Sequence, residues 1–192
     1  MKFTLALIAA ILISFAWLMP IHYRPWVTYT GELYAFFTLF ALAAICLKEK
    51  LKIPAVSLPL LILACVPLIQ FLMGQVFFFS TAMMGFIFVF SFWLAGVLGY
   101  NLSTGDYNRE ETFTNLSYVF LASGTVTGII VLCQWTNLDS VLPGMVNISG
   151  TQRPYANFAQ PNNMATFLVM ALMSCLYLYE KKKIQTKLLF AC

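Results

Sequence analysis

One stretch of the chain gathers side chains that could bind an anionic substrate. It runs from Gly150 to Asn163 and leads into an apolar segment. Pro161 suits the first position of a helix, because the N–H group that proline lacks would have no helical partner there. Gln160 then occupies the cap position, and Asn162 and Asn163 lie in the first turn. The sequence therefore predicts a polar loop that ends at a helix N-terminus.

The predicted helix N-terminus could serve as an anion site. Free N–H groups of a first helical turn and the positive end of the helix dipole both favour negative charge. Arg153 would add a full positive charge, and Tyr155 and Phe158 could stack on sugar rings. The same residues also fit an ordinary entry into a membrane span, with aromatic side chains at the interface. The residue types alone leave both interpretations open.

Other residues with catalytic potential are few. Glu32 and Asp139 are the only carboxylates expected on the same side of the membrane as this loop, and they lie far apart in sequence. A divalent cation that bridges a diphosphate needs clustered carboxylates, so the sequence predicts no metal and no other cofactor. His22 is the sole histidine. No partner for acid–base catalysis can be named for it, and we interpret it as an interfacial side chain.

The apolar segments carry no sign of chemistry of their own. No Lys, Arg, Asp or Glu lies in the middle of any of them. Ion-coupled transporters normally need such charges within the membrane, so a transporter is disfavoured. Gly124 and Gly128 form a G-x-x-x-G pattern, which we interpret as a site of close helix packing. The five cysteines are far apart and odd in number, which indicates neither a disulfide framework nor a metal site.

Membrane helices must position the loop. Hydrophobic residues make up 61% of the 192 residues and charged residues 9%, with a mean hydropathy of +0.83, whereas soluble domains carry roughly 25% charged residues. A helix of about 20 apolar residues crosses the hydrocarbon core, which is roughly 30 Å thick. The candidate spans are Phe3–Met19, Tyr29–Leu47, Ile53–Met73, Phe77–Tyr100, Leu116–Trp135 and Met164–Tyr179, and a seventh begins at Leu188.

These segments predict an all-α integral membrane protein with about six full transmembrane helices plus the start of a seventh. Barrel strands are disfavoured, because the apolar runs lack the alternation of polar and apolar residues that barrels show. Only Gln70, Gly74 and Gln75 interrupt the third and fourth segments. We therefore expect a short interfacial connection between these two spans.

Basic residues orient the spans with the N-terminus in the cytoplasm. In this orientation only Arg24 and Arg153 lie outside, which is a strong positive-inside bias. The loop and the functional face are then periplasmic, in a bacterial inner membrane. Phe3–Phe15 could instead be a signal-peptide core, but no small-residue cleavage pair follows it, so we expect an uncleaved span. The inner basic residues are Lys2, Lys48, Lys50, Lys52, Arg109, Lys181, Lys182, Lys183 and Lys187.

The loop resembles the signature of a known enzyme family. The run RPYANFAQPNNMATFLVMAL, which begins at Arg153, is similar to the signature of bacterial protein O-oligosaccharyltransferases. These pilin-type glycosylation ligases belong to the O-antigen ligase and polymerase superfamily. Its most specific part is Tyr155–Asn162, followed by Ala165 and Thr166, and the Gln-Pro-Asn form is typical of the protein-directed branch. A second patch with this resemblance comprises Pro67–Gln70, Gly74, Gln75 and Phe77–Phe79.

The resemblance implies an activity and its substrates. Members transfer a glycan from undecaprenyl diphosphate to a serine or threonine of a pilin or other periplasmic protein, without a metal. By resemblance Gln160 is the catalytic residue, and Arg153 and Asn157 bind substrate. From their types and positions in the same run, we expect Tyr155 and Asn162 to bind substrate as well. The resemblance also implies a large periplasmic loop with an essential histidine beyond residue 192. We therefore expect residues 1–192 to be the N-terminal transmembrane portion of a longer glycosyltransferase, inactive by itself.

Three other functions stay open. An O-antigen ligase or polymerase acting on lipopolysaccharide would share the fold and differ in its acceptor. A polyprenyl-glycan flippase would need more spans and charged residues lining a cavity. A membrane subunit without chemistry of its own would lack the histidine-bearing outer loop. The sequence downstream of Cys192 would discriminate among these functions.

Overall fold

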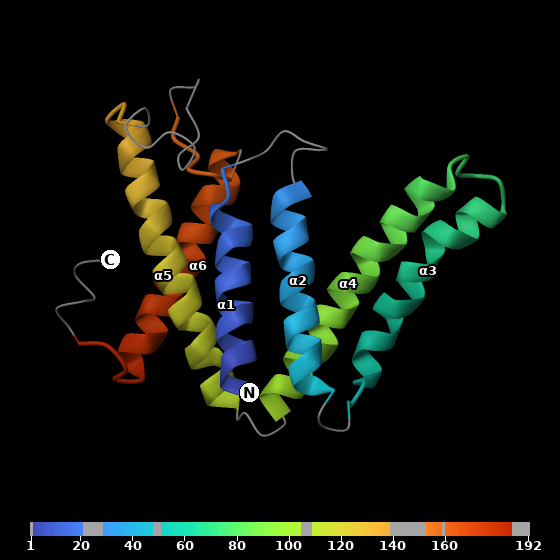
Figure 1. Ribbon diagram of the computed structural model, residues 1–192, viewed down its shortest axis with the longest axis horizontal. Helices are drawn as coiled ribbons and strands as arrows, with labels where there is room; N and C mark the ends of the chain where they lie inside the picture. Colours follow the sequence, from blue (N-terminus) through green and yellow to red (C-terminus); the bar gives the residue numbers. More distant parts are fainter. Residues whose placement is uncertain are drawn as a thin grey trace. The chain divides into compact units, whose positions relative to one another are not determined.

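The computed structural model describes residues 2–20, 29–47, 51–104, 109–138, 153–158 and 160–185 (Figure 1). These residues form α-helices and one short 3₁₀-helix, and no strand occurs among them. The predicted all-α fold is therefore confirmed. In chain order the elements are α1 (Lys2–Leu18), α2 (Tyr29–Cys46), the 3₁₀-helix η1 (Ala55–Ser57), α3 (Leu58–Leu72), α4 (Phe79–Thr104), α5 (Arg109–Trp135) and α6 (Pro161–Glu180).

Six apolar helical segments match the six predicted spans. The first, α1, has 17 residues and rises about 26 Å at 1.5 Å per residue, slightly less than a hydrocarbon core of about 30 Å. The predicted start of a seventh span at Leu188 lies outside the described residues. By helix composition the chain is a multi-span membrane protein. The described part of the chain holds five segments that are long and apolar enough to cross a membrane: Tyr29–Cys46, Ala55–Leu72, Phe79–Thr104, Arg109–Trp135 and Pro161–Glu180.

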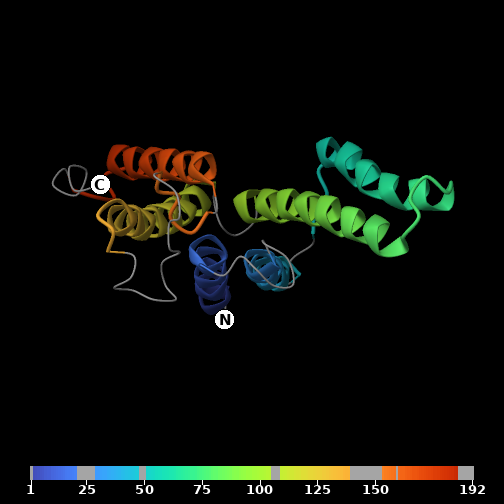
Figure 2. The same ribbon diagram turned by 90° about the horizontal axis from the view of Figure 1, so that it is seen from above.

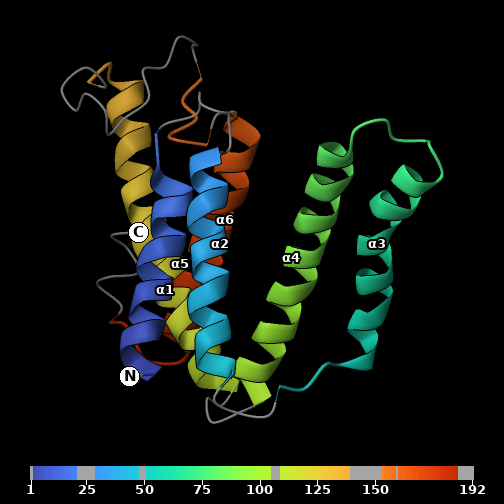
Figure 3. The same ribbon diagram turned by 45° about the vertical axis from the view of Figure 1, so that its right-hand side comes forward.

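The described chain divides into two compact units. One unit comprises Met1–Ala6 and Leu39–Arg109, and its main feature is the hairpin of α3 and α4 (Figure 3). The other comprises Leu7–Thr38 and Glu110–Cys192, and holds most of α1, the first half of α2, α5 and α6. The predicted functional loop belongs to this second unit.

Small and polar residues hold the hairpin together. The Pro67 ring in α3 lies against Gly85 of α4, where an added Cβ would come within 3.1 Å of the Pro67 Cγ atom. Trp93 Nε1 donates a hydrogen bond to Ser57 Oγ at 3.1 Å. At its tip, Gly74 has a φ of 73° and its N–H donates to the Phe71 carbonyl oxygen. The predicted short connection between the third and fourth spans is therefore confirmed.

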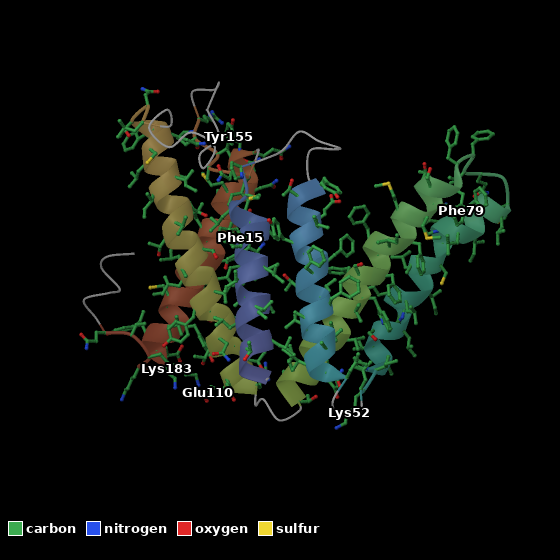
Figure 4. All side chains as sticks on the ribbon, in the orientation of Figure 1. Phe15, Lys52, Phe79, Glu110, Tyr155 and Lys183 are labelled. Atoms are coloured by element: carbon green, nitrogen blue, oxygen red, sulfur yellow. The ribbon has the colours of Figure 1, made fainter. Side chains whose placement is uncertain are left out.

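The base of the hairpin is closed by one asparagine. Asn101 Nδ2 donates to the Lys52 carbonyl oxygen at 2.7 Å, and Asn101 Oδ1 accepts from the Lys52 N–H at 2.8 Å. This pair of bonds ties the segment before η1 to the last turns of α4. Figure 4 shows Lys52 at this end of the hairpin and Phe79 at the other.

The second unit is built around α5, with α1 and α6 beside it (Figure 2). Small and polar side chains dominate the buried face of α5. Ser123 Oγ donates to Ser14 Oγ of α1 at 3.0 Å, and Gly124 meets Ala171 of α6. Every buried polar residue among the described residues belongs to this unit. The buried residues of α5 are Thr114, Ser117, Ser123, Gly124, Thr127, Ile130 and Gln134.

An aromatic cluster joins the same three helices. Trp17 of α1 stacks on Phe120 of α5 with ring centroids 4.8 Å apart, and its ring lies 5.0 Å from that of Phe167 in α6. Phe158 also packs on Phe167, with ring centroids 4.8 Å apart. Because aromatic pairs at such distances contribute beyond the area they bury, the cluster stabilises the end of the unit where the loop lies.

The G-x-x-x-G pattern is a packing site at one of its two glycines. A Cβ built on Gly124 would collide with the Cβ of Ala171, so α5 and α6 approach closely there. A Cβ on Gly128 would meet nothing within 4 Å. The packing interpretation is thus confirmed for Gly124, while Gly128 faces open space.

The two glycines give a matched pair of substitutions. Gly124→Ala should lower the midpoint of thermal unfolding, because overpacking typically costs about 1–3 kcal/mol. Gly128→Ala should leave the midpoint unchanged or slightly raised, since alanine is the better helix former by about 1 kcal/mol. Both variants would be unfolded by heat in the same detergent. Equal midpoints would show that the contact between α5 and α6 is not tight at Gly124.

Candidate functional site

The predicted functional loop lies where α1 and α5 end and α6 begins. Figure 4 shows Tyr155 at this end of the second unit and Glu110 and Lys183 at the opposite end. Residues 153–158 of the loop are described, whereas the part from Gly150 to Gln152 and Ala159 lie outside the described residues. His22 and Arg24 lie outside them as well.

The start of α6 agrees with the sequence prediction. Pro161 is the first residue of the helix and Gln160 is its N-cap, with an extended backbone (φ −141°, ψ 134°). The Met164 N–H donates to the Gln160 carbonyl oxygen at 3.2 Å, so Asn162 and Asn163 precede this bond. The Gln160 side chain makes no capping hydrogen bond. It is exposed at a helix end of positive dipole.

The loop backbone is bound by a glutamine of α5. Gln134 Oε1 accepts hydrogen bonds from the N–H groups of Tyr155 at 3.0 Å and Ala156 at 2.7 Å. Gln134 Nε2 donates to the Ala156 carbonyl oxygen at 2.9 Å. The side chain is 4% exposed. A buried amide of this kind satisfies backbone groups that would otherwise be costly to bury.

A second buried amide ties the loop to α1. Asn157 is 3% exposed, and its Nδ2 atom donates to the Leu18 carbonyl oxygen, 2.6 Å away. Leu18 is the last residue of α1, where helix carbonyl groups lack helical partners. Asn157 therefore supplies a partner that the end of α1 requires.

Between these two anchors the chain turns sharply. Ala156 has a φ of 50°, which is uncommon for a residue with a Cβ atom, and it is almost fully buried beside Ile130 of α5. The Phe158 N–H donates to the Tyr155 carbonyl oxygen at 3.1 Å and closes the turn. A left-handed alanine costs roughly 1–2 kcal/mol, so the surrounding contacts must offset this strain.

The predicted site residues all lie in the loop or at the start of α6, but their side chains differ in exposure to solvent. Arg153, Gln160 and Asn162 are exposed, Tyr155 is half-buried and Asn157 is buried. The exposed residues lie before and after the anchored turn. The sequence predicts that Asn157 binds substrate, whereas the structure gives its buried side chain a bond to the Leu18 carbonyl oxygen, so we interpret Asn157 as an anchor of the loop.

Gln134 was not predicted from the sequence. The sequence feature that could have identified Gln134 is the position of a polar amide between Cys133 and Trp135, close to the end of an otherwise apolar span. Polar side chains inside membrane segments usually face protein or a cavity. That rule predicts a buried glutamine but does not identify the backbone groups of Tyr155 and Ala156 as its partners.

The opposite end of the second unit carries charges of both signs. Lys181 Nζ lies 3.5 Å from Glu110 Oε2, and Tyr118 Oη donates to the Lys183 carbonyl oxygen at 3.4 Å. Glu110 and Glu111 lie in the first turn of α5, where the helix dipole favours negative charge. No group of three or more His, Cys, Asp or Glu residues in the described part of the chain could hold a metal ion.

Two comparisons with known proteins include this loop. Residues 154–179 match a family described as protein glycosylation ligase, and they comprise the anchored turn and nearly all of α6. The chain is also 45% identical, over 185 residues, to the general O-oligosaccharyltransferase of Acinetobacter baylyi. The chain is therefore similar to an O-oligosaccharyltransferase. The resemblance that the Tyr155–Asn162 signature predicted is therefore confirmed.

The extent of this similarity is unequal in the two proteins. The aligned part covers 96% of the present chain and 32% of the Acinetobacter oligosaccharyltransferase. The chain thus spans about a third of the length of this curated relative. No solved structure matches the chain at a significant level.

Asn157 in the loop and Asn162 in α6 form a matched pair of substitutions, because the first side chain is buried and bonded and the second is exposed. Asn157→Ala should lower stability by about 1–3 kcal/mol, because it removes a buried amide and leaves the Leu18 carbonyl group without this donor. Asn162→Ala should change stability by no more than about 0.5 kcal/mol, as is usual for exposed positions. Thermal unfolding of both variants would measure the difference. An unchanged midpoint for Asn157→Ala would contradict the anchoring role.

Proposed function

We propose that this chain is the N-terminal portion of a membrane O-oligosaccharyltransferase that glycosylates proteins. The observation that carries the proposal is the 45% identity to the Acinetobacter oligosaccharyltransferase along 96% of the chain. The family match on residues 154–179 supports it, because it coincides with the loop and helix that present the candidate residues.

The proposed reaction transfers a glycan from undecaprenyl diphosphate to a serine or threonine of a pilin or other periplasmic protein. The acceptor hydroxyl oxygen forms a bond to the anomeric carbon of the glycan, and the bond from that carbon to the diphosphate oxygen breaks. The hydroxyl proton passes to a base, which we expect in the part of the enzyme beyond residue 192. Undecaprenyl diphosphate leaves with the bonding electrons, and no metal is required.

The loop and the start of α6 would act on the leaving group. Arg153 and the backbone amides that open α6 would stabilise negative charge on the diphosphate. Gln160 is exposed and makes no cap bond, so its amide is available to donate to the phosphate or the glycan. Tyr155 and Asn162 complete the proposed contacts with the donor. Asn157, which is 3% exposed and bound to the Leu18 carbonyl oxygen, would act by holding the loop in place.

The proposal requires this loop to face the periplasm of a bacterial inner membrane. Fusions of green fluorescent protein after Lys52 and Lys182 should fluoresce, because the basic residues retain these segments in the cytoplasm. Fusions of alkaline phosphatase after Gly74 and Leu138 should be active, because these ends face outward. Phosphatase activity after Lys182 would overturn the proposed orientation of α6.

Gln160→Ala in the full-length enzyme should lower glycan transfer by about 10²–10³, the usual effect of losing one preorganised hydrogen-bond donor. Protein level should stay near that of the parent, because the side chain does not cap α6. The measurement is the initial rate at which a pilin acceptor is modified in vesicles that contain the lipid-linked donor. Gln185→Ala, which removes an exposed glutamine outside both patches of family resemblance, is the matched control.

Arg153 variants test the anion site in the same assay. Arg153→Lys keeps the charge but loses the bidentate geometry, so it should retain partial activity, whereas Arg153→Ala should lose nearly all. Full activity in both Gln160→Ala and Arg153→Ala would return the loop to an ordinary span entry. The diphosphate site would then lie elsewhere in the enzyme.

A further inference from the structure

We propose that Gln134 is a positioning residue for the donor site. It sets the path of the loop through Tyr155 and Ala156, so that Arg153 and Gln160 are presented together to the diphosphate. This inference rests on the proposed function and adds to it a residue outside the signature run. It also assigns a role to the end of α5, which the sequence marked only as an apolar span.

The geometry of the amide makes the glutamine suited to this role. Its oxygen binds two successive N–H groups, of Tyr155 and Ala156, and its nitrogen binds the Ala156 carbonyl oxygen. An amide has two acceptor sites and two donor hydrogens, so both of its ends engage the same turn. Bonds to three backbone groups of adjacent residues fix the direction of the loop as well as its distance from α5.

Burial excludes Gln134 itself from contact with the donor. The side chain is 4% exposed, whereas Arg153 and Gln160 are exposed. Any effect of Gln134 on transfer must therefore pass through the backbone that it holds. Asn157, bound to the Leu18 carbonyl oxygen, provides a second anchor for the same turn.

The turn needs an external partner. Ala156 has a φ of 50°, a strained conformation for alanine. The bond from the Phe158 N–H to the Tyr155 carbonyl oxygen is the turn's own closing bond. Without the amide of Gln134, the N–H and carbonyl groups of Ala156 would be buried without these partners. Relaxation of the turn would then shift Arg153 relative to Gln160.

Amide hydrogen exchange measures directly how firmly the three hydrogen bonds of Gln134 hold the loop; we call these bonds the clamp. In the full-length enzyme in nanodiscs, Gln134→Met keeps the side-chain length but removes the three hydrogen bonds. Amide exchange in a peptide that covers residues 154–158 should accelerate about tenfold, in line with the loss of a few net hydrogen bonds. Gln75→Met makes the same change at an exposed glutamine and should leave exchange in this peptide unchanged.

Gln134→Glu is the conservative variant. A carboxyl group keeps an oxygen that can accept from Tyr155 and Ala156, and its protonated form can also donate to the Ala156 carbonyl oxygen. Exchange in the 154–158 peptide should therefore return most of the way to the parent value. If Gln134→Met does not accumulate, Gln134→Asn, which is one methylene shorter, provides the same comparison with Gln134→Glu.

Kinetics distinguish positioning from folding. Gln134→Met should raise the KM for the lipid-linked donor about tenfold or more, since small misplacements of binding groups can cost up to about 10²-fold in rate. Gln134→Glu should restore most of the loss. A merely structural role would reduce the amount of active enzyme, and hence the apparent kcat, while the donor KM stayed at the parent value.

The exchange and kinetic experiments test different parts of the proposal. Unchanged exchange in Gln134→Met would overturn the clamp. Faster exchange with an unchanged donor KM would overturn the positioning role. Absence of transfer by the parent enzyme would sink the proposed function and the positioning role with it, while the exchange data would still decide whether Gln134 holds the loop. Faster exchange together with a raised KM, both reversed in Gln134→Glu, would support the proposal.

Discussion

Polar groups of a membrane helix have no water to bind within the hydrocarbon, so each needs a partner inside the protein. In the second unit this requirement falls on α5, whose buried face is mostly small and polar. Thr127 Oγ1 donates to the Ser123 carbonyl oxygen, Ser123 bonds to Ser14 of α1, and Gln134 binds the loop. One helix face thus links its own backbone, a neighbouring helix and an irregular segment.

This arrangement lets the loop have a fixed backbone and accessible side chains. An irregular segment next to lipid is tolerated where its backbone groups are satisfied by protein. Gln134 and Asn157 satisfy those of the turn and of the end of α1. The residues on either side of the turn, Arg153 and Gln160, stay exposed. Rigid backbone with accessible side chains is the condition for a preorganised binding site.

The sequence predicted the helices well, because apolar runs of span length have one stable form in lipid. Pro161 predicted the start of α6 correctly. The fifth apolar run begins at Leu116, whereas α5 begins at Arg109, because the helix continues beyond the apolar run into a first turn that carries acidic residues. Burial of Asn157 and the partners of Gln134 could not be predicted, because they depend on which distant backbone groups folding brings close.

The bond from Asn157 to Leu18 also bears on how the protein is made. Its two residues are 139 positions apart, and ribosomes add about 5–20 residues per second. Asn157 is therefore synthesised roughly 7–28 s after Leu18, the residue whose carbonyl group it binds. During that interval the end of the first helix must rest in the insertion machinery or against lipid headgroups. Completion of this part of the fold is thus tied to the arrival of the sixth helix in the bilayer.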